Sequence, residues 1–212
     1  MIGFLHTAEV HVPRFGRLMS EEAPGVPVTH LVDTSLLADA RVEGRDGLVR
    51  AGVAARLAEL LEGGAVEIVC TCSTIGGIAE ELGALRVDRP MAEEAVRIAR
   101  SHGGRIAVVA AVESTIGPTR ALLLDSAQRM GAEVTLVEAP CLDAWRLFEA
   151  GQVDAFLDAI AAHVVKVAES ADVVVLAQAS MADVAERDLG LKVPVLASPR
   201  SGVRAVVRGL KR

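Results

Sequence analysis

The chain has few aromatic residues and no excess of basic ones. Among its 212 residues there are no tyrosines, one tryptophan and four phenylalanines, and the formal net charge is -6. Nucleic-acid-binding proteins carry a basic face, and those that bind single strands stack the bases on aromatic rings. The composition therefore argues against nucleic acid as a partner.

Long apolar runs are also missing, although 51% of the residues are hydrophobic and the mean hydropathy is +0.40. The longest run extends from Ile106 to Val112, far short of the ~20 residues of a membrane-spanning helix. The first ten residues, MIGFLHTAEV, have neither a basic stretch nor a long apolar core. We therefore expect a soluble cytoplasmic protein with no membrane partner.

Cysteine is scarce as well. The three cysteines, an odd number, do not make a disulfide framework. A chain of this length buries enough apolar surface to fold without disulfides or a structural metal. We expect reduced thiols, no metal site, and either one large domain or two small ones.

Short β-branched runs alternate with long amphipathic stretches. Most of the runs are continuously apolar, which is typical of parallel strands covered on both faces. The predicted strands are Met1–His6, Val26–Val32, Glu67–Cys72, Arg105–Ala111, Glu133–Glu138, Asp172–Ala177 and Val193–Ala197. The predicted helices are Gly47–Glu62, Arg89–His102, Thr119–Met130, Val153–Ser170 and Gly202–Leu210. This alternation predicts an α/β fold of right-handed βαβ units.

The chain also contains an internal repeat. Residues 68–81, IVCTCSTIGGIAEE, align without gaps on residues 174–187, VVLAQASMADVAER. The offset is 106 residues, half the chain. Any two strand–turn–helix units share part of this pattern, but the offset favours duplication. We predict two α/β halves, one formed by residues 1–90 and completed by residues 195–212, the other by residues 91–194.

Polar residues follow the predicted strands, where open α/β sheets bind ligands. They are His6, Thr7, Asp33, Ser35, Cys72, Ser73, Thr74, Glu113, Ser114, Thr115, Cys141, Asp143, Gln178, Ser180 and Asp183. This set has no basic cluster, and no nucleotide-binding glycine motif accompanies it. The pattern argues against nucleoside triphosphates and NAD as ligands. Arg200 is the only basic residue that we place close to a strand end.

Cys72 is the sharpest candidate for chemistry. It lies where a buried strand is expected to open into a helix, whose N-terminus stabilises anions and lowers a thiol pKa. A thiolate beside amides and hydroxyls can take a proton next to a carboxylate, or act as a nucleophile. The alternative is that Cys72 is a small buried hydrophobe.

The other candidates have simpler structural explanations. Core packing explains Cys70 better than a C-x-C metal pair, because nothing nearby completes a ligand set. Cys141 also suits packing. His6 ends the first strand and could be either a structural residue or part of a site.

These residues resemble the aspartate/glutamate racemase superfamily, which includes glutamate, aspartate and hydantoin racemases, maleate isomerase and arylmalonate decarboxylase. The resemblance covers nearly the whole chain. The strand followed by Cys72-Ser-Thr74 is similar to the family's Cys-Asn-Thr motif. Residues 108–115 resemble the Thr-rich turn that opens the second half. Residues 138–151 resemble the loop before the last long helix, and 172–177 the strand that carries the second catalytic cysteine.

The resemblance implies a fold and a mechanism. The fold would have two pseudo-symmetric flavodoxin-like halves, with parallel sheets flanked by helices and an active-site cleft between them, in a homodimer. The family needs no cofactor: one cysteine removes the α-proton of a small carboxylate, and the opposite cysteine supplies a proton. The implied catalytic positions are Cys72, Gln178 and Ser180. The implied substrate-binding positions are His6, Thr7, Ser73, Thr74, Ser114 and Thr115.

The sequence departs from the family at the second cysteine. By the internal alignment this position is Gln178, and a carboxamide is neither an acid nor a base at neutral pH. Ser180 could relay a proton only weakly. Ser73 replaces the family's asparagine, and His6-Thr7 replaces its acidic residue after the first strand.

Three hypotheses follow. The first is a cofactor-independent racemase or isomerase of a small carboxylic acid or amino-acid derivative, with Cys72 as acid/base and His6, Ser180 or water serving the other face. The second is a one-cysteine lyase or isomerase, acting like the decarboxylase or the maleate isomerase. The third is a non-catalytic binder of a small anion.

Overall fold

The computed structural model describes residues 1–210 and contains two four-stranded, all-parallel sheets. The described residues form two compact units. One consists of Met1–Asp88 and the residues from Pro199 onward, and the other of Arg89–Ser198. Residues 211–212, part of the C-terminal segment assigned to the first half from sequence, lie outside the described residues. The predicted fold class, two α/β halves with parallel sheets, is confirmed.

The first unit has the strand order β2-β1-β3-β4. All five residues of the central strand β1 are buried, because helices cover both faces of this sheet. Its elements are β1 (Ile2–His6), α1 (His11–Glu22), β2 (Val28–Val32), α2 (Thr34–Ala40), α3 (Asp46–Glu62), β3 (Glu67–Cys70), α4 (Ser73–Glu81), β4 (Leu85–Arg86) and α9 (Ser198–Leu210).

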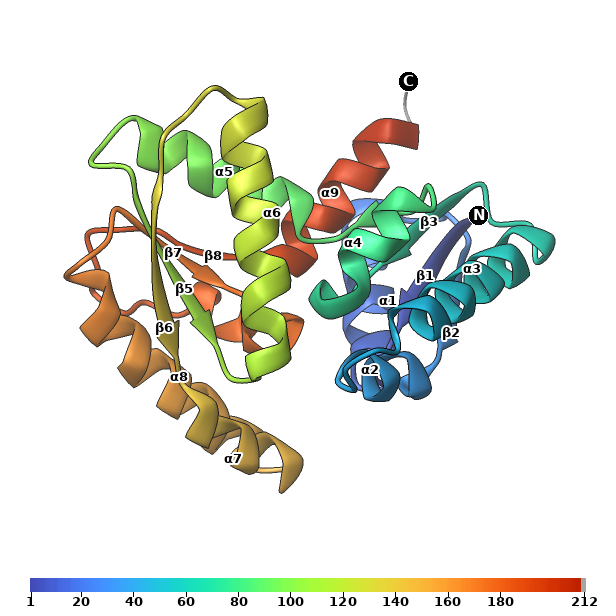
Figure 1. Ribbon diagram of the computed structural model, residues 1–212, viewed down its shortest axis with the longest axis horizontal. Helices are drawn as coiled ribbons and strands as arrows, with labels where there is room; N and C mark the ends of the chain where they lie inside the picture. The colour runs from blue at the N-terminus through green and yellow to red at the C-terminus, as the bar shows by residue number, and fades with distance from the viewer. Residues whose placement is uncertain (211–212) are drawn as a thin grey trace. The chain divides into compact units, whose positions relative to one another are not determined.

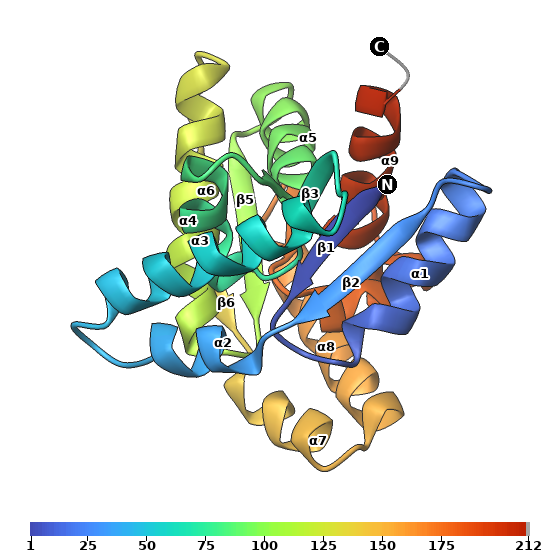
Figure 2. The ribbon, with the colours of Figure 1, turned by 90° about the vertical axis from the view of Figure 1, so that its right-hand side faces the viewer.

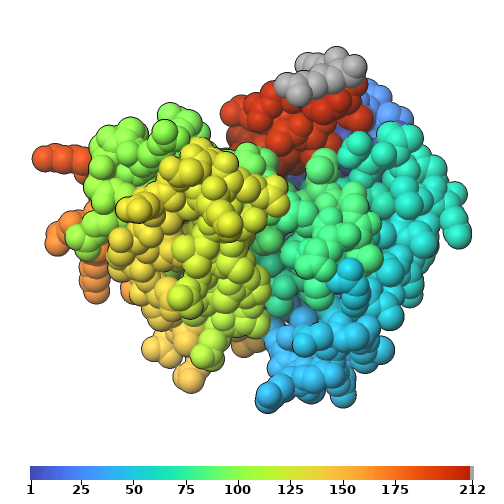
Figure 3. Space-filling view, turned by 45° about the horizontal axis from the view of Figure 1, so that its top comes forward, coloured from blue at the N-terminus to red at the C-terminus, as the bar shows by residue number. Residues whose placement is uncertain are grey.

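The two faces of this sheet pack against different helices. Leu5 packs into a cluster with α2, α3 and α4, whereas Phe4 packs against α1 and α9, since successive strand side chains point to opposite faces. Figure 2 shows α1 and α3 on opposite sides of β1. Helix α9 buries Val203, Val206 and Val207, and its outer side, red in Figure 3, faces solvent.

The second unit has the order β6-β5-β7-β8, the same topology as the first. Helices α5 and α6 cover one face of the sheet, and α8 covers the other (Figure 1). Its elements are α5 (Arg89–Arg100), β5 (Arg105–Ala110), the 3₁₀ helix η1 (Glu113–Thr115), α6 (Ile116–Arg129), β6 (Thr135–Pro140), η2 (Leu142–Ala144), α7 (Trp145–Glu149), α8 (Val153–Ala168), β7 (Val173–Leu176), η3 (Ala179–Glu186) and β8 (Val195–Ala197).

The internal repeat corresponds to matching positions in the two sheets. The strand that ends before Cys72 is β3, and the strand that ends before Gln178 is β7; each pairs with the first strand of its sheet. The helix expected after β7 is the 3₁₀ helix η3, whereas α4 is a true α-helix. Strand β8 pairs with β7, in the second unit.

Candidate functional site

Cys72 lies at the junction between β3 and α4. It is the N-cap residue of α4, with an extended backbone (φ -102°, ψ 118°), and its side chain makes no capping hydrogen bond. The residue is partly exposed, although the strand before it is buried. The first N–H groups of a helix lack intrahelical partners, and the helix dipole favours negative charge there. The turn therefore presents a partly exposed thiol where an anion is stabilised.

Cys70 is a packing residue. It is 1% exposed, and its Sγ donates to the Cys72 carbonyl oxygen at 3.6 Å. Burial raises the pKa of the Cys70 thiol, and the neighbouring Cys72 adds to that effect. In residues 1–210, no group of three or more His, Cys, Asp or Glu side chains is placed to hold a metal ion.

Arg86 and Asp88 form a buried ion pair beside α4. The Arg86 Nε and Nη2 atoms donate to the two carboxylate oxygens of Asp88 at 2.7 and 3.1 Å. The side chains are only 5% and 2% exposed. A Cβ at Gly76 would lie 3.2 Å from Arg86 Nε, so the missing side chain makes room for the guanidinium. The sequence analysis missed this pair, whose signal is the alternation of Arg86 and Asp88 with the apolar residues Leu85 and Val87.

His6 lies in a buried hydrogen-bond chain. Its Nδ1 is 2.8 Å from Thr71 Oγ1, and its Nε2 is 2.9 Å from His30 Nδ1. Thr71 donates its own hydroxyl proton to the Leu5 carbonyl oxygen at 3.2 Å, so it accepts from His6 Nδ1–H. Nε2 of the neutral imidazole then accepts from His30.

Burial, followed by the nearby His30 and His11, lowers the pKa of His6 to about 3, so His6 is neutral near pH 7. The ring is fully buried and both of its nitrogens are engaged. The structure thus places His6 in the interior of the first unit. Thr7, which follows it, is 6% exposed.

Gln178 follows β7, and its side chain is hydrogen-bonded to the backbone directly after β5. Its Oε1 accepts hydrogen bonds from the backbone N–H groups of Ala111 at 2.7 Å and Val112 at 3.0 Å. Backbone N–H groups only donate, so the bonded atom of the carboxamide is the oxygen. The position aligned with Cys72 thus carries a side chain that organises the turn after β5.

Three buried hydroxyl oxygens lie on the elements that follow β5 and β7 in the second sheet. Ser114 on η1, Thr119 on α6 and Ser180 on η3 each have an Oγ or Oγ1 atom with no hydrogen-bond partner in residues 1–210. A buried polar atom without a partner costs ~1–3 kcal/mol. Such atoms call for an explanation, and a polar ligand or ordered water is the ordinary one. Thr115, also on η1, is 4% exposed.

The candidate residues form two sets, one in each unit. Cys72, Ser73 and Thr74 share the start of α4 in the first unit, and Ser73 is buried. The second set, on η1 and η3 in the second unit, consists of Ser114, Thr115, Gln178 and Ser180. The first set follows the carboxyl end of β3, and the second follows the carboxyl ends of the neighbouring strands β5 and β7, as expected for ligand sites of α/β sheets.

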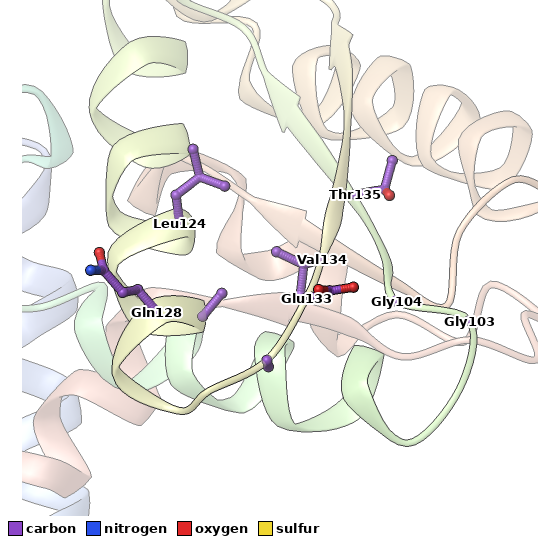
Figure 4. Close-up of a pocket in the computed structure, with 9 residues that line it drawn as sticks. Gly103, Gly104, Leu124, Gln128, Glu133, Val134 and Thr135 are labelled. Atoms are coloured by element: carbon purple, nitrogen blue, oxygen red, sulfur yellow. The ribbon is translucent and has the colours of Figure 1, made fainter.

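A groove of about 630 Å³ opens at the other end of the second sheet. It is lined by the start of β5 and β6 and by Leu124 and Gln128 of α6 (Figure 4). Glu133 is its only titratable side chain, and none of the candidate residues lines it. The groove therefore lies away from the chemistry-bearing turns. Among residues 1–210, the helices are too short or too polar to cross a bilayer.

Solved structures with the same fold include several racemases. Glutamate racemase from Francisella tularensis matches with a TM-score of 0.71 and 15% identity, over 99% of this chain and 80% of that one. Allantoin racemase from Klebsiella pneumoniae matches with a TM-score of 0.69 and 18% identity, over 99% and 87% of the two chains. Aspartate racemase from Picrophilus torridus matches with a TM-score of 0.68 and 12% identity, over 99% and 94%.

These neighbours are members of the aspartate/glutamate/hydantoin racemase superfamily, and the resemblance inferred from sequence is confirmed at the level of the fold. No family model matches the chain, and no curated protein matches its sequence. At 12–18% identity the likeness shows the fold, and it does not identify a substrate.

Proposed function

We propose that this protein, which has the fold of the racemase superfamily, is a cofactor-independent racemase or isomerase of a small carboxylic acid or amino-acid derivative. The observation that carries the proposal is the position of Cys72: a partly exposed thiol at the N-cap of α4, directly after a buried strand. The proposal includes a cytoplasmic homodimer, as the family resemblance implies. Light scattering should then give twice the 22.2 kDa mass of one chain.

In the proposed reaction the Cys72 thiolate removes the proton on the carbon next to the substrate carboxylate. The C–H electron pair moves into the carboxyl group and gives an enediolate. Helix N-terminal N–H groups, such as that of Thr74, stabilise the developing negative charge. The new Cys72 thiol can return the proton only to the face from which it came.

Inversion requires an acid for the opposite face. His6 is neutral and has both ring nitrogens engaged, which disfavours it for this role. The Gln178 carboxamide neither gives nor takes a proton at neutral pH. In the proposal, the Ser180 hydroxyl or a water molecule supplies this proton.

Gln178 favours a second candidate function. A one-cysteine lyase or isomerase of the same fold needs a proton donor on one face only, and the Gln178 Oε1 is already bonded to two backbone amides. Such an enzyme would exchange or add a proton with retention of stereochemistry. A non-catalytic binder of small anions would neither exchange nor add a proton.

Solvent deuterium exchange followed by proton NMR tests the proposal. The protein is incubated in D₂O with both enantiomers of aspartate and glutamate, a substituted hydantoin, maleate and an arylmalonate. We expect exchange of an α-proton that is lost in Cys72→Ser and kept in the matched control Cys141→Ser. Exchange with inversion supports the racemase, and exchange with retention supports the second candidate. Undiminished turnover by Cys72→Ser would contradict both candidate functions.

A further inference from the structure

Strand β4 is hydrogen-bonded to the strand that precedes Cys72. Cys70 and Arg86 are paired in register on the parallel strands β3 and β4, and the Val87 N–H donates to the Cys70 carbonyl oxygen at 3.0 Å. Paired residues on neighbouring strands point to the same face of a sheet. Cys70 packs into the cluster on the α4 face, so the Arg86 side chain lies on that face as well.

The Arg86 guanidinium packs against the helix that follows Cys72. A Cβ added at Gly76, the fourth residue of α4, would lie 3.2 Å from Nε, 3.3 Å from Cζ and 3.4 Å from Nη2. Nearly equal distances to three atoms of one planar group mean that the guanidinium turns its face to Gly76. A Cβ added at Gly77 would lie 3.8 Å from Nη1, an ordinary van der Waals contact. Gly76 is therefore the closer of the two glycines to Arg86.

Asp88 holds the guanidinium in this position. Its carboxylate oxygens accept hydrogen bonds from Nε and Nη2 at 2.7 and 3.1 Å, and both side chains are buried. A bidentate pair restrains the plane of a guanidinium as well as its position. Nε and Nη2 are two of the three atoms that face Gly76. A methyl group added at Gly76 would therefore displace α4, because the end of Arg86 is not free to move away.

Stability does not account for this contact. A buried ion pair generally stabilises a fold no better than apolar side chains of similar volume. Glycine within a helix is less favourable than alanine, and α4 contains Gly76 and Gly77 in succession. An unfavourable helix residue and a desolvated charge pair thus meet at one place. What their contact provides is a fixed position of α4 relative to β3, the two elements that Thr71 and Cys72 join.

We propose that Arg86 is a positioning residue for Cys72. Held by Asp88, its guanidinium packs on α4 at Gly76 and fixes the N–H groups of the first helical turn relative to the Cys72 Sγ. These N–H groups stabilise a thiolate, and the effect of a helix end is confined to its first turn. The inference rests on the proposed function in taking Cys72 to be the reacting group. All of the residues involved belong to the first unit.

Alkylation of Cys72 by iodoacetamide between about pH 6 and pH 9 tests the inference. Gly76→Ala adds a methyl group against the guanidinium, and Gly77→Ala, with the same gain in helix propensity, is the matched control. We expect the pH profile of Gly76→Ala to lie about half a pH unit higher than that of the parent, so that the rate at pH 7 falls about 3-fold. Gly77→Ala should react as the parent does.

Peptide mass spectrometry follows all three cysteines in one sample. Cys141, in the second unit, reports on the reagent, and the buried Cys70 reports on unfolding of the first unit. A contact that served stability alone would lower the melting temperature of Gly76→Ala without moving the Cys72 profile. Identical profiles for Gly76→Ala and Gly77→Ala would therefore overturn the inference.

Arg86→Lys provides the decisive measurement if Gly76→Ala does not fold. The ammonium keeps a charge opposite Asp88 but lacks the planar group that faces Gly76. We expect Cys72 alkylation at pH 7 to fall by the same factor of about 3. A parent-like profile in Arg86→Lys would refute the positioning role.

Arg50→Lys is the control for exchanging arginine for lysine beside α4. The exposed Arg50 side chain pairs with Glu81, the last residue of that helix, and its replacement should leave the Cys72 profile unchanged. No substrate is added in these measurements. Failure of the inference is thus distinguishable from failure of the proposed function, which deuterium exchange reports separately.

Discussion

Thr71 Oγ1 accepts a hydrogen bond from His6 Nδ1 at 2.8 Å and donates its own proton to the Leu5 carbonyl oxygen at 3.2 Å. This direction of donation sets the tautomer of a fully buried imidazole and leaves Nε2 to accept from His30. A residue at the end of the first strand is thereby part of the core of the first unit.

Removing the Thr71 hydroxyl should destabilise the protein. Thr71→Val preserves the shape but leaves the His6 Nδ1–H group buried without an acceptor, which costs ~1–3 kcal/mol. Urea unfolding measures the change in the free energy of unfolding. Thr135→Val, at an exposed position of β6, is the control and should change it by less than ~0.5 kcal/mol. An equal effect of both substitutions would contradict the hydrogen-bond chain.

Stability should fall in mild acid because the pKa values of His6, His11 and His30 are lowered in the folded protein. The pKa of His6 is lowered to about 3, first by burial and then by His30 and His11. Burial and Arg14 lower the pKa of His11 to about 4, and burial lowers that of His30. Between these values and ~6.5 the unfolded chain binds more protons, so the free energy of unfolding is highest above that pH and decreases as the pH falls.

The contribution of His6 alone should approach ~1.4 kcal/mol per pH unit between about pH 6 and pH 4. Urea unfolding across this range measures the slope. His6→Gln should reduce the slope by about one proton, whereas His102→Gln, at an exposed position, should leave it unchanged. A flat profile in the parent protein would contradict the burial of His6.

Loss of one partner of the Arg86–Asp88 pair should lower the free energy of unfolding. Asp88→Asn leaves a guanidinium that is 5% exposed without its carboxylate, which should cost ~3–5 kcal/mol. The exposed pair Arg97–Glu94 provides the comparison, and Glu94→Gln should cost at most ~1 kcal/mol. Thermal and urea unfolding measure both. Similar costs for the two substitutions would mean that Arg86 is solvated in solution.

Two glycines of α9 should respond in opposite directions to alanine. A Cβ at Gly202 would lie 2.4 Å from the Val87 carbonyl oxygen, so Gly202→Ala forces a backbone shift and should cost ~1–3 kcal/mol or more. Gly209 has nothing within 4 Å of such a Cβ, and Gly209→Ala should stabilise by up to ~1 kcal/mol through helix propensity. Equal signs would contradict the packing of α9 on Val87.

The cysteines should differ in labelling. Cys70 is 1% exposed and burial raises its pKa, so iodoacetamide should reach it only on unfolding. Cys72, which is partly exposed at a helix N-terminus, should be alkylated in the native protein. Peptide mass spectrometry distinguishes the two sites. Native labelling of Cys70 at the rate of Cys72 would show that β3 is open in solution.

Local patterns in the sequence predicted much of the fold. Continuous apolar runs predicted the long strands, such as β1 and β5, because a strand covered on both faces must be apolar throughout. The helices α1, α2 and α7 and the two-residue strand β4 were missed. Helices α2 and α7 and strand β4 have 7, 5 and 2 residues, too few periodic positions to be distinguished from loops. Helix α1 has 12 residues but contains Pro13 and Gly16, which are typical of turns.

The position of Cys72 was also evident from sequence, since a strand followed by a small polar turn and a helix start is a local pattern. The roles of its neighbours were not. His6 and Thr71 are 65 residues apart, and Gln178 is 67 residues from Ala111. Only the pairing of parallel strands, in which distant segments become neighbours, brings those groups within hydrogen-bond distance. The sequence by itself determined the α/β alternation and the thiol at the start of α4. The tertiary structure alone decided that His6 is buried and that Gln178 Oε1 accepts hydrogen bonds from Ala111 and Val112, because hydrogen-bond partners depend on register across the sheet.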